Sequence, residues 1–350
     1  MHETVLRRSG SRRRVAATAL ALAVGLLAGA CAGSSASGSG GGTDSVTVGV
    51  SGDNVNILPV WVAQQKGYFA KYGINVKLAV LSATSTNSAL ASGSVQFLAG
   101  SAKNFLTAVQ QNVGEIAVAQ TSIGVPLGLV VSTNFASAHH ITKDTPLATV
   151  AKDLVGSTGG SASTSTTAEV NLFLKPYGVS TSSMKIATLS SAQTYLTALK
   201  TNEIDWFMTS EPTPLQAQAQ GAGIVVATSK NVAAWAPETI GPGNVTITTK
   251  SYAAKNPDVV KKFTQAMQAA VQYIHGNEQS GAVTAIAAKE LSGVPNDVLE
   301  QSIAEIDWPE TSAMTVAGWT AGVKFTVQTG AVSASTTVRQ GTDWTNQYLG

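Results

Sequence analysis

Short runs of β-branched and other apolar residues alternate with segments of helical pattern between residues 46 and 249. Strands and helices that alternate at this spacing are typical of an open α/β sheet. The pattern predicts strands at residues 46–50, 74–81, 95–99, 116–120, 127–132, 154–155, 184–189, 204–208, 224–227 and 245–249, and helices at 56–72, 85–91, 102–111, 168–174, 192–201 and 212–220.

The alternation starts afresh at residue 154, so the chain predicts two α/β units. A helical tail follows from Asn256, an N-cap residue, and Pro257 at the first helical position. We expect its helices at residues 258–275, 281–291, 297–306 and 316–328, with a short piece near Trp344.

Five strand-to-helix loops are rich in small polar residues. Two lobes with a cleft at the carboxyl ends of their strands would bring such loops face to face. The longest loop, Gly156 to Thr166, offers hydroxyls and unpaired N–H groups before a helix, which suit an anion or another acceptor-rich ligand; a capped turn with a solvated tip is the alternative. The five loops are residues 51–56, 100–104, 120–124, 156–166 and 209–212.

The first 30 residues have the pattern of an export signal. A basic region reaches Arg14, an apolar run extends from Val15 to Ala30, and small residues precede Cys31. This ending resembles bacterial lipoprotein signals, in which Cys31 would become the acylated N-terminus. The pair Arg12-Arg13 leaves twin-arginine export open beside the general secretory route. Residues 31–45 form a Gly/Ser linker, whose 14 residues after Cys31 would span roughly 20 Å.

Charge and cysteine content exclude several function classes. The chain carries +2 overall, but five of its six arginines lie in the first 14 residues. Without residues 1–30, the 22 basic residues fall by five to 17 and the 20 acidic residues fall by Glu3 to 19, a net charge of −2. We therefore expect no nucleic-acid partner. With Cys31 alone, neither an internal disulfide nor a cysteine-based metal site is possible.

Four separated motifs resemble the nitrate/sulfonate/taurine-type substrate-binding proteins of ABC importers. Residues 58–76 contain Lys66-Gly67-Tyr68-Phe69 and Gly73-Ile74-Asn75-Val76 of that family's opening. The other three are Gly93-Ser94-Val95-Gln96-Phe97, Asp153-Leu154-Val155-Gly156, and Asn202-Glu203-Ile204-Asp205 followed by Ser210-Glu211-Pro212. Gln96, Val155 and Asn202 replace the family's Asp, Lys and Gly. The motifs cover roughly residues 46–275.

The resemblance implies a periplasmic-binding-protein-like α/β fold of type II, with two lobes, a central cleft and a hinge crossed twice. Lobe one would be residues 46–135 with 242–350, and lobe two residues 136–241. Trp235, between alanines in the connection back to lobe one, is the aromatic residue expected to contact the ligand. The ligand-binding residues carried over by motif are Asp53, Asn54, Asn56, Ser101, Thr121, Ser161, Ser163, Thr209 and Glu211. Asn56 and Ser161 could instead be N-caps, and Glu211 could simply favour a helix start.

Enzymatic interpretations find little support. The three histidines after the signal lack the spacing of a metal site or a catalytic triad. Ser182-x-x-Lys185 has no accompanying Lys-Thr-Gly, and residues 159–163 miss the Gly-x-Ser-x-Gly pattern. The family also resembles enzymes that make the thiamine pyrimidine, but those carry a cysteine-rich motif that this chain lacks. We expect no enzymatic activity, no cofactor and no metal.

The sequence thus predicts a monomeric, exported substrate-binding protein, anchored by acylated Cys31 to the outer face of the cytoplasmic membrane. It would capture a small organic molecule or oxyanion between its lobes and deliver it to an ABC permease with its ATPase. Only Arg339 remains as an arginine after the signal, which disfavours a bidentate site for sulfonate or nitrate. The alternatives are an extracytoplasmic ligand sensor or scavenger on the same fold and, less favoured, an enzyme related to thiamine-pyrimidine synthesis.

Overall fold

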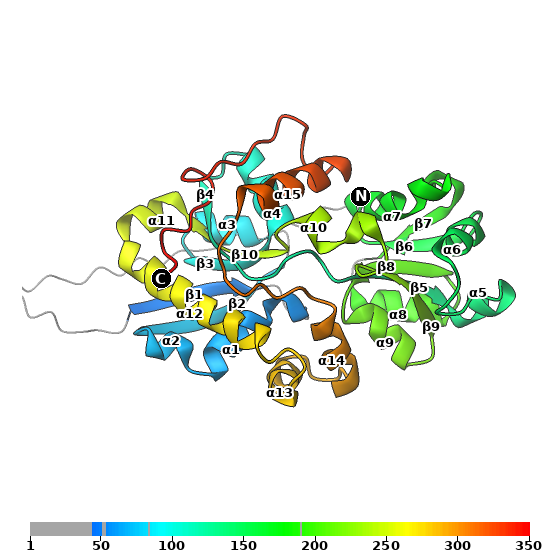
Figure 1. Ribbon diagram of the computed structural model, residues 1–350, viewed down its shortest axis with the longest axis horizontal. Coiled ribbons are helices and arrows are strands. Elements are labelled where there is room, and N and C mark those ends of the chain that lie inside the picture. The colour runs from blue at the N-terminus through cyan, green and yellow to red at the C-terminus, as the bar shows by residue number, and fades with distance from the viewer. Residues whose placement is uncertain (1–43, 51–53, 83–84, 190) are drawn as a thin grey trace, which may run out of the picture. The chain divides into compact units, whose positions relative to one another are not determined.

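The computed structural model describes residues 44–50, 54–82, 85–189 and 191–350 (Figure 1). The predicted signal, Cys31, residues 32–43 of the predicted linker and Asp53 lie outside the described residues. The linker was predicted to extend to residue 45, but Asp44 and Ser45 begin strand β1 (Asp44–Val50). No helix in the described part of the chain is both long and apolar enough to cross a membrane.

The first of two five-stranded sheets has the order β2-β1-β3-β10-β4. Strand β1 is parallel to β2 and β3, whereas β10 runs antiparallel to β3 and β4. We call the part built on this sheet lobe one. Its strands are β1 (Asp44–Val50), β2 (Ile74–Val80), β3 (Phe97–Ser101), β4 (Glu115–Gln120) and β10 (Asn244–Thr249).

The second sheet, in lobe two, has the order β7-β6-β8-β5-β9. Strand β6 is parallel to β7 and β8, and β5 is antiparallel to β8 and β9. Its strands are β5 (Leu127–Ser132), β6 (Thr158–Ser161), β7 (Lys185–Thr188), β8 (Trp206–Ser210) and β9 (Gly223–Thr228).

The chain passes between the two sheets twice, once between β4 and β5 and once between β9 and β10. This confirms the predicted α/β architecture of two lobes joined by a double crossing. One placement needs correction: residues 127–132 were assigned to lobe one, but as β5 they pair with β8 and β9 inside the second sheet. The first crossing therefore lies upstream of residue 135.

The helices of the α/β units lie mostly where the apolar pattern placed them, with several short ones added. The expected helix 56–72 is interrupted because Gly67 adopts a left-handed φ of 72°, which starts a second helix. The helices up to β10 are α1 (Leu58–Gln65), α2 (Tyr68–Lys71), α3 (Thr86–Ala91), α4 (Ala102–Gln110), α5 (Thr133–Ala138), α6 (Leu147–Asp153), α7 (Thr164–Leu174), α8 (Ala192–Lys200), α9 (Thr213–Ala219) and α10 (Pro237–Ile240), with short 3₁₀ turns at Val55–Ile57, Lys175–Tyr177, Thr181–Ser183 and Ala233–Trp235.

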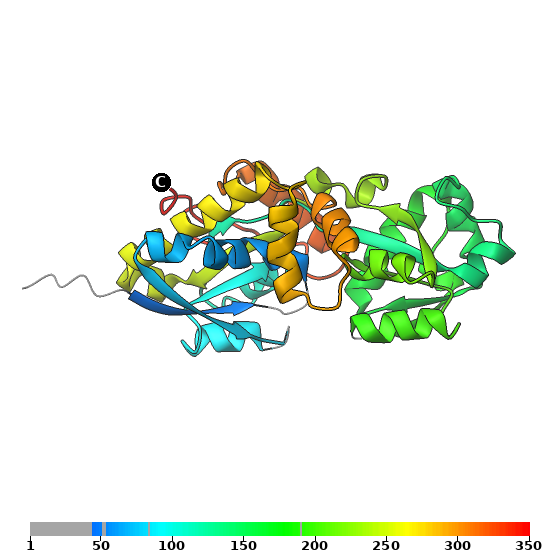
Figure 2. The same cartoon turned by 90° about the horizontal axis from the view of Figure 1, so that it is seen from below.

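The helical tail, yellow to red in Figures 1 and 2, packs mainly on lobe one. Phe263 of the tail stacks on Phe97 of β3 at 4.0 Å between ring centroids and on Phe69 of α2 at 5.3 Å. Burial of three aromatic rings at one place fixes the tail to the sheet. Near Trp344 the chain forms turns and a bridge to Ala117 rather than the expected helix. The tail helices are α11 (Lys250–Lys255), α12 (Pro257–His275), α13 (Gly281–Glu290), α14 (Asn296–Ala304) and α15 (Val316–Gln328).

The glycine-rich stretch 156–166 differs most from expectation. Residues 153–155 end helix α6 and begin the turn after it, and Gly159 and Gly160 lie in the inner strand β6. A Cβ atom on Gly159 would overlap the ring of Trp206, which is fully buried beside it. The Trp206 indole N–H also donates to Ser157 Oγ at 2.8 Å. These small residues thus let a strand approach a tryptophan. The helix begins at Thr164, four residues before the predicted start at residue 168.

Because the indole fills the space of the missing side chain, Gly159→Ala should destabilise the protein by about 1–3 kcal/mol through overpacking. Gly281→Ala is the matched control, since nothing lies within 4 Å of a Cβ there at the first residue of α13, and it should stabilise by up to about 1 kcal/mol. Urea unfolding of both variants measures the difference. Equal stability of the two would contradict this packing explanation of β6.

Candidate functional site

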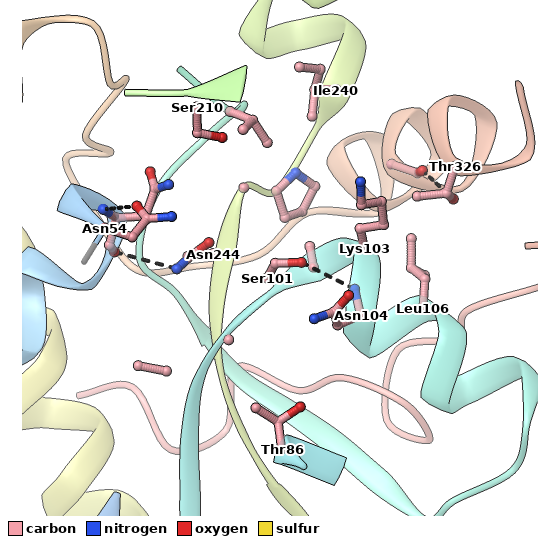
Figure 3. Close-up of a pocket in the computed structure, with 18 of the residues that line it drawn as sticks. Asn54, Thr86, Ser101, Lys103, Asn104, Leu106, Ser210, Ile240, Asn244 and Thr326 are labelled. Carbon is pink, nitrogen blue, oxygen red and sulfur yellow. Dashed lines mark hydrogen bonds between the residues drawn. The ribbon is translucent and has the colours of Figure 1, made fainter. Parts of the chain in front are cut away.

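A cavity of about 250 Å³ is lined by residues of both lobes. Its walls come from the segments after β1 and β3, from the end of β8, from both crossings and from α3, α7 and α15. Polar and apolar side chains share the lining, with Leu98, Leu106 and Phe325 among the apolar ones, and Figure 3 shows ten of the lining residues labelled. The polar lining residues are Asn54, Asn56, Thr86, Asn87, Ser101, Lys103, Asn104, Thr166, Glu169, Thr209, Ser210, Asn244 and Thr326.

The wall from lobe one is built where β3 runs into α4. Ser101 ends the strand and caps the helix, because its Oγ accepts the backbone N–H of Asn104 at 3.2 Å. This cap fixes the first turn of α4, so that Lys103 and Asn104 both line the cavity (Figure 3). The wall therefore presents a hydroxyl, an amide and an ammonium group within four consecutive residues.

An ion pair joins the two lobes at the cavity. Lys103 Nζ of α4 lies 2.9 Å from Glu169 Oε1 of α7. The two side chains differ in burial, with 35% of the Lys103 side chain exposed but only 7% of that of Glu169. Helix α7 is held in place nearby, since the Trp235 indole N–H donates to the Glu169 backbone carbonyl at 2.9 Å.

Asparagines supply much of the remaining polar surface. Asn54 Oδ1 accepts the backbone N–H of Asn56 at 2.8 Å, and the Asn244 side-chain amide donates to the Asn56 carbonyl at 3.4 Å. Asn56 itself is buried in this group, with 6% of the residue exposed. Its side-chain Oδ1 nevertheless has no hydrogen-bond partner among the described residues. Because a buried acceptor without a partner is costly, this oxygen is a candidate for accepting a hydrogen bond from a ligand.

Four of the predicted binding residues are brought together at this cavity. Asn54, Asn56 and Ser101 line it from lobe one, and Thr209 lines it from the end of β8 in lobe two. Asp53 is adjacent in sequence to Asn54 but lies outside the described residues.

Three predicted hydroxyls do not line the cavity. Thr121, in the first crossing, is 2% exposed, and its backbone N–H donates to the carbonyl of Asn244 in β10. Ser161 Oγ is engaged with the Ser163 carbonyl and with Thr167 Oγ1. Ser163 is the N-cap of α7, accepting the Thr166 N–H at 3.2 Å. The Ser161 and Ser163 hydroxyls thus hold the segment between β6 and α7 together, and Thr121 is buried beside β10, so all three lie outside the cavity lining.

Glu211 and Trp235 also lie away from the cavity lining. Trp235 was expected to contact the ligand, but it is fully buried in the lobe-two core, where its ring packs against Phe173 at 5.6 Å. Glu211 is 2% exposed and accepts the Leu215 N–H at 3.1 Å in the first turn of α9. Burial raises the pKa of Glu211 to about 8, and the charge of Glu305 adds to the increase.

Sequence reasoning missed Lys103, Glu169 and Asn244 as lining residues. Ser101 pointed to the first turn of α4, so the neighbouring Lys103 could have been proposed from the same signal. Glu169 lies between apolar residues of α7. A carboxylate among apolar residues of a helix is unusual, and this pattern could have marked Glu169 as a candidate site residue. In the described part of the chain, no cluster of three or more His, Cys, Asp or Glu side chains could hold a metal ion.

The family model described as "NMT1/THI5 like" matches residues 54–280, which is more than half of the chain. This confirms the family resemblance found in the sequence motifs. No curated protein sequence matches the chain.

Solved structures share the fold at low sequence identity. A putative periplasmic sulfonate-binding protein SsuA from Methylobacillus flagellatus is 15% identical, with a TM-score of 0.65 over 88% of this chain and 93% of that one. The periplasmic nitrate-binding protein NrtA from Synechocystis PCC 6803 is 18% identical, with a TM-score of 0.62 over 84% and 83%. A mutant of DszB in complex with biphenyl-2-sulfinic acid is 15% identical, with a TM-score of 0.62 over 88% and 96%.

The raised pKa of Glu211 predicts a pH-dependent stability. The folded state holds this proton up to about pH 8, whereas an ordinary glutamate loses it near pH 4.5. The folded state thus binds more protons in this window, so the contribution of Glu211 to stability declines as the pH rises from about 4.5 to about 8.

Glu211→Gln removes this titration, and the amide oxygen can still accept the Leu215 N–H. The variant should match the parent near pH 4 and exceed its unfolding free energy by at least about 1.4 kcal/mol, one pKa unit, at pH 8.5. Urea unfolding across the pH range measures this, with the exposed Glu203→Gln as control. A constant difference between variant and parent at all pH values would contradict the assignment.

Proposed function

The chain belongs to the NMT1/THI5-like family, and we propose that it is an extracytoplasmic substrate-binding protein of an ABC importer. It captures a small organic molecule between its two lobes and delivers it to a membrane permease. The observation that carries the proposal is the cavity of polar and apolar side chains whose lining residues come from both lobes. Two of the similar structures are named as periplasmic proteins that bind sulfonate and nitrate, which supports the same role for this chain.

Capture follows from the way in which the lobes are connected. The two crossings, residues 121–126 and 229–243, are the proposed hinge. A ligand that contacts Ser101 and Asn104 of lobe one together with Thr209 of lobe two favours the conformation in which all three can reach it. Differential affinity of this kind shifts the equilibrium towards closed lobes, which are the form that a permease would accept.

Export and anchoring belong to the same proposal. Residues 1–30 direct the protein out of the cytoplasm, and acylated Cys31 holds it at the outer face of the membrane through the linker that precedes β1. A permease is itself membrane-bound, so a tether keeps the binding protein near its partner and raises their effective concentration.

A second candidate is an enzyme, which the likeness to DszB favours. The chain's only cysteine, Cys31, directly follows the predicted export signal, and the cavity presents amides, hydroxyls and one ion pair rather than a nucleophile with its base. A ligand sensor or scavenger on the same fold would use the same cavity without a permease. Binding without turnover separates the enzyme from the other two.

Ligand binding by both lobes predicts the effects of two substitutions. Asn104→Ala and Thr209→Val each remove a polar group from the cavity wall, and each should weaken binding roughly tenfold with little effect on stability. Native mass spectrometry of the purified protein identifies a co-purified ligand, and calorimetry measures its affinity.

Ser163→Ala is the matched control for this pair. It should leave the affinity unchanged but cost about 1 kcal/mol of stability, because the N-cap of α7 is lost. If Ser163→Ala weakened binding while Asn104→Ala and Thr209→Val did not, the assignment of the cavity would be wrong.

Acylation at Cys31 predicts that Cys31→Ser abolishes incorporation of labelled palmitate and releases the protein from the membrane fraction. One acyl-bearing residue supplies the whole anchor in this proposal, so no partial retention is expected. Fractionation of producing cells with a blot of both fractions measures the release. Retention of the Cys31→Ser protein in the membrane would argue against a lipid anchor.

A further inference from the structure

The two partners of the cross-lobe ion pair are not equivalent. Glu169 is 5% exposed as a residue, so its carboxylate has little access to water. Lys103 keeps about a third of its side chain exposed on the first turn of α4, and a flexible four-carbon stem lets its ammonium return to solvent. Loss of the pair therefore costs little at Lys103 but leaves a buried charge at Glu169.

This asymmetry decides which ligand charge the cavity accepts. A cationic group that displaces Lys103 keeps Glu169 paired, while the displaced ammonium is rehydrated. An anionic group that recruits Lys103 leaves Glu169 without its partner. Among the described residues that line the cavity, Lys103 is the only basic side chain, so no second cation offsets that cost.

Asn56 points to the same ligand chemistry from another wall. Its Oδ1 is buried and lacks a donor among the described residues, so a ligand N–H group satisfies it where a ligand oxygen anion does not. Neighbouring asparagine amides and the hydroxyls of Thr209 and Ser210 can accept further N–H groups.

We propose that the ligand carries a protonated amine, which replaces Lys103 as the partner of Glu169, and that the site discriminates against sulfonates, nitrate and other anions. This inference rests on the proposed function, because it assumes that the cavity between the lobes binds the transported molecule. Glu169 is then the residue that determines specificity, and Lys103 occupies the ammonium position while no ligand is bound.

The test uses the full-length protein and a library of compounds small enough for the cavity. Every carbon skeleton in the library is present as a primary amine, as the corresponding alcohol, and as a carboxylate or sulfonate. Thermal-shift screening followed by calorimetry gives the affinities within each series. The amine should bind at least roughly tenfold more tightly than its alcohol, because a charge-assisted hydrogen bond to a buried carboxylate is gained.

Two variants separate the proposed roles. Glu169→Gln should reduce amine binding to the level of the alcohol. Lys103→Gln should tighten amine binding severalfold, because the competing ammonium is gone, and the amine should raise the melting temperature of this variant more than that of the parent. The second variant keeps the test informative if Glu169→Gln fails to fold. Lys143→Gln, at an exposed position outside the cavity lining, is the control for a general change in charge.

Tightest binding of the anionic or uncharged member in the series would overturn the amine proposal while leaving the proposed function intact. Weaker amine binding by Lys103→Gln would overturn it as well, since Lys103 would then assist rather than compete. Failure of every compound to bind would contradict both the amine proposal and the proposed function.

Discussion

The contact on which the site depends is the ion pair between Lys103 and Glu169, because it joins helices of different lobes at the cavity. Each partner is placed by its own lobe: Ser101 caps the start of α4, and Trp235 holds the α7 backbone at Glu169. A second pair, Lys230 with Glu305 at 3.4 Å, links the second crossing to the end of α14. Besides the two crossings, the Lys103–Glu169 pair thus connects the lobes directly, whereas Lys230 ties the second crossing itself to the helical tail.

The cavity combines rigid walls with polar groups that are only partly satisfied. The Ser101 and Ser163 side chains accept backbone N–H groups at helix starts and so fix α4 and α7, while the Ser101 hydroxyl can still donate to a ligand. By contrast, the Asn56 Oδ1 has no partner and Glu169 has a replaceable one. Groups of this second kind are the ones that a ligand can satisfy, since the protein gains most where its own hydrogen bonding is incomplete.

A large part of the fold could be predicted from the sequence, because its strands are short, apolar and separated by helical patterns. Most of these strands and helices are present in the structure. Ser101 was also predictable, since a serine at the end of a strand and the start of a helix is a typical N-cap.

Strand β6 was missed because glycines have low strand propensity, and only the approach of Trp206 explains them. Trp235 was misplaced because its core neighbours, such as Phe173, are distant in sequence. The Lys103–Glu169 pair was not predictable for the same reason, since the residues lie on separate lobes.

The most direct test of the account is a crystal structure of the protein purified, without denaturation, from the cells that produce it. The account predicts a bound small molecule in the cavity between the lobes, in contact with residues such as Asn104 and Thr209 from each side, with a nitrogen atom within hydrogen-bonding distance of Glu169. A bound molecule located elsewhere, or one whose anionic group is held by Lys103 with Glu169 left unpaired, would contradict it.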